Sequence, residues 1–163
     1  MAKSRRKFDS VRASRDGHEF HEAWVARRCL GLLLPKDDLV GVAIEGLAGD
    51  DQNKVTVEAN EIADAVLYYG SDASFERARS IVIVQVKYSK AAELKPFRAA
   101  DAKKTLGKFA NSYSAYKRRH GMKQASEKLR FELVTNRPIL DELNEALRGL
   151  ILGTALHGTA KTQ

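Results

Sequence analysis

The chain has 163 residues, of which 44% are hydrophobic and 30% charged. This length suits one domain with a sizeable core, and the composition is that of an ordinary water-soluble protein. No apolar run approaches the roughly 20 residues that span a bilayer, and no apolar segment follows the basic start, so we expect neither a membrane span nor a secretory signal. The single Cys29 cannot form an internal disulfide, which favours a reducing, cytoplasmic location.

Charge divides the chain into three parts. Residues 1–15 hold six basic side chains against the single acid Asp9, and we expect them to form a flexible basic N-terminal arm. Residues 16–152 carry the periodic apolar patterns of a folded domain. Residues 153–163 are small and mostly polar, and we expect a tail or the start of a linker to a further C-terminal region.

The formal net charge of +7 favours a polyanionic partner. Two basic sets are the candidate contacts. They either bind phosphate or are solvated, and the second set is part of the longest predicted helix. The two sets are Arg5, Arg6 and Lys7 in the arm, and Lys103, Lys104 and Lys108 in the helix.

Residues 18–34 are predicted to form the first helix, because Ala23, Ala26, Leu30 and Leu33 repeat at helical spacing and Val25 and Cys29 widen the stripe. Glu22 lies at the edge of this stripe. It is either a candidate for a functional site or an exposed acid stabilised by the helix dipole.

Two histidines share this helix with Glu22. His18 and His21 are three residues apart, whereas the zinc-protease helix needs two histidines four apart. No cysteine cluster completes a tetrahedral site either, so we expect no zinc at this helix.

Three apolar runs are predicted to form consecutive strands over residues 39–45, 61–69 and 81–87. The third is apolar on both faces, as in a central strand that helices cover on both sides. Val82, Val84 and Val86 share one face, and the other carries Ile81, Ile83, Gln85 and Lys87. Residues 70–80 resemble a long hairpin loop, so the second and third strands are expected to be antiparallel.

Polar side chains interrupt these apolar rows. Asp64 shares a row of the second strand with Val66 and Tyr68, and antiparallel pairing with the third strand would bring it beside Gln85 and Lys87. Glu45 closes the first strand and could point to the same place. A buried lysine needs a partner, since the desolvation of an unpaired ammonium is costly.

Helix, strand and helix follow. Residues 99–119 carry an apolar stripe at helical spacing, residues 129–135 alternate as a strand, and residues 121–128 connect them. Asn136 and Pro138 are predicted to open a last helix. Because a helix crosses between the third and fourth strands, that pair is expected to be parallel. The sequence thus predicts an α/β fold whose mixed sheet is flanked by helices.

This order, with Asp64 on the second strand and Gln85-Val86-Lys87 on the third, resembles the PD-(D/E)XK nuclease superfamily. Where many members have Asp or Glu, this chain has Gln85, and that QxK variant resembles the Mrr-like branch of restriction endonucleases. More specifically, the chain is similar to the N-terminal double-stranded-DNA endonuclease domain of bacterial anti-phage effectors, of the CBASS or Avs/STAND type. The stretches that match are Gly17–Leu34, Ile44-Glu45-Gly46, Ile62-Ala63-Asp64, Val84–Ser89 and Leu133–Pro138.

The resemblance implies a restriction-endonuclease-like αβββαβ core and metal-dependent hydrolysis of DNA phosphodiester bonds. The implied cofactor is Mg²⁺, or Mn²⁺ in its place, which prefers hard oxygen ligands. Asp64 would be the essential ligand, Glu45 or Glu22 the second, and the Gln85 carbonyl oxygen a neutral third. Lys87 would orient or deprotonate the attacking water, or stabilise the charge that develops on the phosphorus oxygens.

The resemblance also implies double-stranded DNA as the partner, gripped by both basic sets. It implies an effector role in anti-phage defence, a sensor or oligomerisation domain fused to this one, and an active homo-oligomer. Two alternatives remain open. In the first, the chain is an inactive nucleic-acid-binding domain of the same fold, in which Asp64 and Lys87 form a buried ion pair. In the second, it is an interaction domain that neither binds nor cuts DNA.

Overall fold

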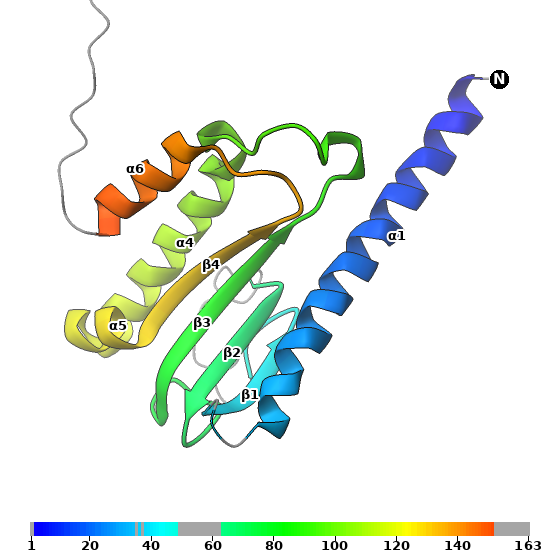
Figure 1. Cartoon of the computed structure of the whole chain (residues 1–163). Helices are drawn as coiled ribbons and strands as arrows, with labels where there is room; N and C mark the ends of the chain where they lie inside the picture. The colour runs from blue at the N-terminus through cyan, green and yellow to red at the C-terminus, as the bar shows by residue number, and fades with distance from the viewer. Residues whose placement is uncertain (1, 35, 37, 49–62, 152–163) are drawn as a thin grey trace, which may run out of the picture.

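The computed structural model describes residues 2–34, 36, 38–48 and 63–151. Four strands form one sheet in the order β1-β2-β3-β4, with helix α1 on one face and helices α4 and α6 on the other (Figure 1). The expected tail, 153–163, lies outside the described residues. The elements in chain order are α1 (Ala2–Cys29), η1 (Leu30–Leu33), β1 (Leu39–Ile44), β2 (Ala65–Gly70), β3 (Ala78–Lys87), η2 (Lys90–Ala92), α4 (Ala99–His120), α5 (Met122–Lys128), β4 (Leu129–Thr135) and α6 (Asp141–Ile151).

The pairing of the strands confirms the predicted mixed sheet. β1 pairs with β2 and β2 with β3 in antiparallel fashion, whereas β3 and β4 are parallel. The short link between β2 and β3 permits a hairpin, while α4 and α5 form the crossover that a parallel pair needs. The fold class is therefore α/β, with helices on both faces of the sheet.

The alternation predicted for β3 is also confirmed. Ile81 and Ile83 pack on the α4 side, in a cluster with Phe109 and Tyr116 of that helix. Val84 packs on the α1 side. Burial on both faces is typical of a central strand, and it explains the nearly continuous β-branched run.

The prediction for the N-terminal segment was wrong, because α1 runs without a break from Ala2 through Gly17 to Cys29. A single glycine costs a helix only about 1 kcal/mol relative to alanine. In addition, an Arg15–Glu19 ion pair of 3.4 Å spans the glycine. The basic segment is therefore a helical extension, which runs out beyond the sheet in Figure 1.

The apolar stripe predicted for α1 was also misplaced. The side chain of Val25 is buried, but Leu30 and Leu33 are 57% and 78% exposed. The α-helix ends at Cys29, and the next residues form a 3-10 helix. Ala23 and Ala26, which lie within the α-helix itself, are exposed as well, so the face that packs on the sheet is the neighbouring one with Val25 and Cys29.

Two boundaries after β3 also differ from the prediction. Residues 121–128 are not an irregular connection, since Met122–Lys128 form the short helix α5. Asn136 does not open the last helix, which begins at Asp141. Its amide instead joins the ends of β3 and β4, with Oδ1 accepting the Ser89 N–H at 3.0 Å and Nδ2 donating to the Ser89 carbonyl at 3.3 Å. A side chain that forms these two long-range bonds is not available as a helix cap.

Among the described residues, no helix is both long and apolar enough to cross a bilayer.

Candidate active site

Asp64 stands directly before β2 and is held by the neighbouring strand. Its N–H donates to the Val84 carbonyl at 3.0 Å, which extends the ladder between β2 and β3 by one residue. Its carboxylate oxygen Oδ2 accepts the Val86 N–H at 2.6 Å and also the side-chain amide of Gln85. Since Gln85 is buried, two fixed donors hold this oxygen. The structure thus brings Asp64 and Gln85 together, as the strand alternation predicts.

Glu45 follows the last residue of β1 and is joined to Asp64 through the backbone. Its N–H donates to the Asp64 carbonyl at 2.9 Å. The φ angle of Glu45 is 53°, in the left-handed region, which costs a non-glycine residue about 1–2 kcal/mol. Such strain persists where the surrounding structure imposes it, and it is often found at functional sites. Glu45 is therefore a stronger candidate for the site than its sequence position alone suggests.

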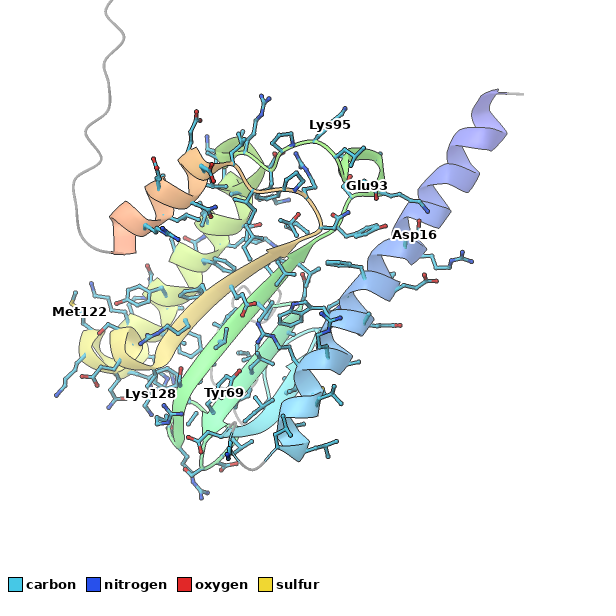
Figure 2. All side chains as sticks on the ribbon, in the orientation of Figure 1. Asp16, Tyr69, Glu93, Lys95, Met122 and Lys128 are labelled. Atoms are coloured by element: carbon cyan, nitrogen blue, oxygen red, sulfur yellow. The ribbon has the colours of Figure 1, made fainter. Side chains whose placement is uncertain are left out.

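Helix α1 is attached to the ends of the strands by three contacts, all within its middle turns. A carbonyl oxygen can only accept, so His21 carries a proton on Nε2 in the first of these contacts. The contacts are a hydrogen bond of 3.0 Å between His21 Nε2 and the Asp64 carbonyl, a ring contact of Phe20 with Tyr88 at 5.2 Å between centroids, and an ion pair of 3.0 Å between Asp16 and Lys90. Figure 2 shows Asp16 on α1, close to the loop that follows β3.

An open pocket of about 240 Å³ lies between these elements. It combines two carboxylates with two imidazoles and an aromatic ring, a set that can hold a cation on one side and donate hydrogen bonds from the other. Glu22 is exposed and is not among the lining residues, so the structure favours Glu45 over Glu22 as the companion of Asp64. The lining residues are Gly17, His18, His21, Glu45, Asp64, Val86 and Tyr88.

Lys87, the last residue of β3, is partly buried and lies opposite Thr135 of β4. Within the described part of the chain, it forms no hydrogen bond and no ion pair. In particular, the ion pair with Asp64 that the inactive alternative requires is absent between these two described residues, since the carboxylate bonds Gln85 and Val86 instead. Lys87 is also not among the residues that line the pocket around Asp64, so its expected place beside Asp64 stays a prediction.

The metal-binding side chains near Asp64 are few. Among the described residues, no group of three or more His, Cys, Asp or Glu side chains is placed to hold a metal ion. Mg²⁺ usually takes one or two protein carboxylates and completes its shell with water and substrate phosphate. Asp64 and Glu45 line one pocket and are the candidate carboxylates for such a shell. Gln85 turns its amide nitrogen toward Asp64, so the third ligand expected at its oxygen stays a prediction.

The two basic sets lie on opposite faces of the sheet. Lys103 and Lys104 are exposed on α4, and Lys108 is partly exposed there. Arg5, Arg6 and Lys7 belong to the N-terminal turns of α1, which covers the other face (Figure 1). Of the two helices that carry the basic sets, α1 lines the pocket around Asp64 and no described residue of α4 does, so the extension of α1 is the basic segment better connected to the candidate site.

The sequence reasoning missed His18, His21 and Tyr88 as members of the site. The three-residue spacing of the histidines did carry a signal, since it places both on one helix face. The zinc-protease pattern does not fit this spacing, but the mismatch does not exclude contacts of the two histidines with a backbone carbonyl or a substrate.

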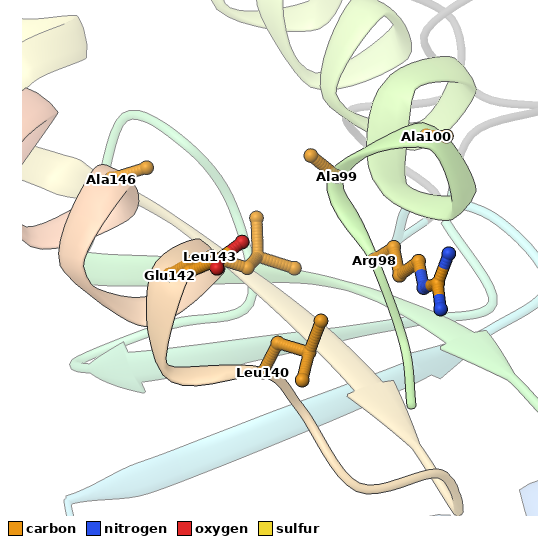
Figure 3. A pocket seen from close by; sticks show the side chains of 7 residues that line it. All are labelled: Arg98, Ala99, Ala100, Leu140, Glu142, Leu143 and Ala146. Atoms are coloured by element: carbon orange, nitrogen blue, oxygen red, sulfur yellow. The ribbon is translucent and has the colours of Figure 1, made fainter. Parts of the chain in front are cut away.

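A second pocket, of about 460 Å³, lies between the start of α4 and the start of α6 (Figure 3). It has mostly small or apolar walls, with Arg98 and Glu142 as charged members. Neither residue is part of the cluster around Asp64, so this pocket does not belong to the candidate site.

Comparison of the chain with protein-family models finds no match, and comparison with curated proteins finds none at a significant level. The classification therefore rests on the structure. This chain has an α/β fold with a four-stranded mixed sheet flanked by helices.

Proposed function

We propose that this chain is a metal-dependent endonuclease domain that hydrolyses phosphodiester bonds of double-stranded DNA. The observation that carries the proposal is the position of Asp64, which directly precedes β2, bonds the side chain of Gln85 and lines one pocket with Glu45. The resemblance of this arrangement to the Mrr-like branch of the PD-(D/E)XK superfamily supports it. The net charge of +7 favours a polyanionic substrate.

In this proposal, the residues of the chain divide the work of hydrolysis. Bound Mg²⁺ or Mn²⁺ would supply charge neutralisation at the phosphate and a more acidic water. Asp64 and Glu45 would bind the cation; the two donors on Asp64 bond its Oδ2, and no described residue bonds its Oδ1. Lys87 orients the attacking water or stabilises the charge on the phosphate oxygens in the transition state.

The wider role is proposed on the resemblance alone. The chain would be the effector domain of a bacterial anti-phage protein, joined to a sensor or oligomerisation domain and active as a homo-oligomer in the cytoplasm. Clustering by such a partner would raise the local concentration of basic helices on DNA and so strengthen binding.

The second candidate function is a nucleic-acid-binding domain that does not cut. It is favoured by the finding that no three metal-binding side chains of the described residues converge. In that case, DNA binding would be salt-sensitive and independent of Mg²⁺.

Plasmid nicking and linearisation at high protein concentration separate the two functions. Wild type is compared with Lys87→Ala, Glu45→Gln and Asp64→Asn, each with Mg²⁺, with Mn²⁺ and with EDTA. Lys87→Ala is the most informative variant, because Lys87 has no partner among the described residues and its loss should leave the fold intact.

The endonuclease proposal expects metal-dependent cleavage that falls by at least about 100-fold in Lys87→Ala, the range that one lost catalytic group gives. Cleavage that persists in EDTA, or in all three variants, contradicts it. Salt-sensitive binding of DNA by a folded wild type that never cuts it supports the second candidate.

A further inference from the structure

Two histidines of α1 line the candidate site, and of these two His21 is the one with a partner among the described residues. Its Nε2 bonds the Asp64 carbonyl, which already accepts the Glu45 N–H. That nitrogen is therefore committed to holding the site together. The role of His21 is positional, since it touches the backbone of a candidate metal ligand and attaches α1 to it.

His18 lies on the same side of the helix, one turn closer to the basic extension. It lines the pocket with Asp64 and Glu45, yet it is exposed, and within the described part of the chain it forms no hydrogen bond and no ion pair. His18 therefore holds none of the described elements in place. Its ring N–H is available to a molecule that enters the pocket.

The chemistry of the pocket limits what such a molecule can be. The groups around His18 are the carboxylates of Glu45 and Asp64, the ring of His21 and the ring of Tyr88. Carboxylates repel an anion, so a phosphate can enter only with a cation on their side and hydrogen-bond donors on the other. Of the two histidines that line the pocket, His18 is the one whose ring N–H bonds no described residue.

We propose that His18 is a substrate-contacting residue, whose ring N–H donates to a non-bridging oxygen of the DNA phosphate held in this pocket. The inference rests on the proposed function, which it deepens by assigning the residue that contacts the phosphate opposite the carboxylates. In this arrangement α1 has two tasks. Its basic extension approaches the duplex, and one turn of the same helix contacts the phosphate next to Asp64.

The decisive measurement is NMR of the histidine ring nitrogens during titration with a short DNA duplex. Ca²⁺ replaces Mg²⁺ in this titration to prevent turnover. The probe is the duplex itself, and His120 is the internal control, because it lies at the end of α4, stacked on Phe75 at 4.0 Å between ring centroids. The inference expects the His18 ring signals to shift and those of His120 to stay in place.

Cleavage kinetics form the second measurement. His18→Ala should lower kcat/KM by about 10- to 100-fold, the range for a hydrogen bond to a charged group. His18→Gln keeps an N–H donor and should recover part of that loss, which a purely structural role would not predict. Ala23→Gln is the matched control, because position 23 is exposed on the same helix and outside the pocket, and it should stay within about twofold of wild type.

A third comparison uses duplexes in which sulfur, a weaker acceptor, replaces one non-bridging oxygen of the cleaved phosphate. Cleavage is measured with Mn²⁺, which tolerates sulfur better than Mg²⁺ does. Sulfur at the oxygen that His18 contacts should slow cleavage by wild type. With that diastereomer, the slowing should be several-fold smaller in His18→Ala, because the variant has no hydrogen bond to lose.

The outcomes separate the inference from the proposed function. If the His18 ring signals do not shift while the duplex is bound, the inference is overturned whether or not the protein cuts DNA. If they shift and His18→Ala loses cleavage, both stand. If they shift in a protein that never cuts, the phosphate contact stands and the catalytic function fails.

Discussion

Replacing Asp64 by alanine should destabilise the fold as well as the site. Asp64→Ala removes the acceptor of two donors, the Val86 N–H at 2.6 Å and the amide of Gln85, whose residue is only 5% exposed. Hydrogen bonds to a charged group contribute about 1.5–3 kcal/mol each, so the upper bound is about 6 kcal/mol. Asp64 is itself partly exposed, and water can replace part of this loss. We expect the free energy of unfolding to fall by about 2–4 kcal/mol.

Urea denaturation of Asp64→Ala, Asp64→Asn and Lys87→Ala tests this value. Asp64→Asn keeps an oxygen for the Val86 N–H and should lose about 1 kcal/mol. Lys87→Ala, with no partner to abandon among the described residues, should stay within about 0.5 kcal/mol of wild type. If Asp64→Ala unfolds at the wild-type urea concentration, the carboxylate does not hold the strands in the way described. An inactive but destabilised Asp64→Ala would not by itself identify Asp64 as a metal ligand, whereas an inactive and stable Lys87→Ala would identify Lys87 as a catalytic group.

Three further predictions follow from other parts of the structure. Glu45→Gly should raise the free energy of unfolding by up to about 1 kcal/mol, because glycine adopts a φ of 53° without strain. Calorimetry of the same variant should show weaker Mg²⁺ binding. A loss of stability would mean that the backbone at Glu45 is not strained. The pKa of Asp101 is lowered chiefly by the hydrogen bond that its carboxylate accepts from the backbone N–H of Arg98. The ionised carboxylate therefore stabilises the folded state above about pH 4, the pKa of an aspartate in the unfolded chain. This stabilisation is lost as the pH falls through the lower pKa of the folded state. Asp101→Asn should therefore flatten the acid limb of a stability-against-pH curve, and an unchanged acid limb would argue against this bond. Gly41→Ala would place a methyl carbon 2.6 Å from the Ala73 Cβ and should lower the thermal midpoint through a loss of about 1–3 kcal/mol; a wild-type midpoint would show that the loop of Ala73 yields freely.

Patterns of period two determined the sheet and part of the site from the sequence alone. Alternation along β3 assigned its two faces, and the predicted hairpin between β2 and β3 indicated that Asp64 would lie beside Gln85 and Lys87, of which the structure shows the contact with Gln85. The long connection through α4 made β3 and β4 parallel. These features follow from the chain's local geometry, since neighbouring side chains point to opposite faces of a strand and connection length limits the direction of the next one.

Tertiary contacts decided which side chains join Asp64. Local pattern favoured a stripe of Ala23, Ala26, Leu30 and Leu33 on the first helix and left both Glu45 and Glu22 as candidates for the second metal ligand. In the structure, Val25 packs on the sheet, Glu45 enters the pocket and Glu22 does not. The face of α1 that packs is chosen by the shape of the sheet and by contacts such as the one between His21 and Asp64, which are 43 residues apart. Helical spacing shows which residues share a face of a helix. Which of these faces is buried depends on the surface that the helix packs against.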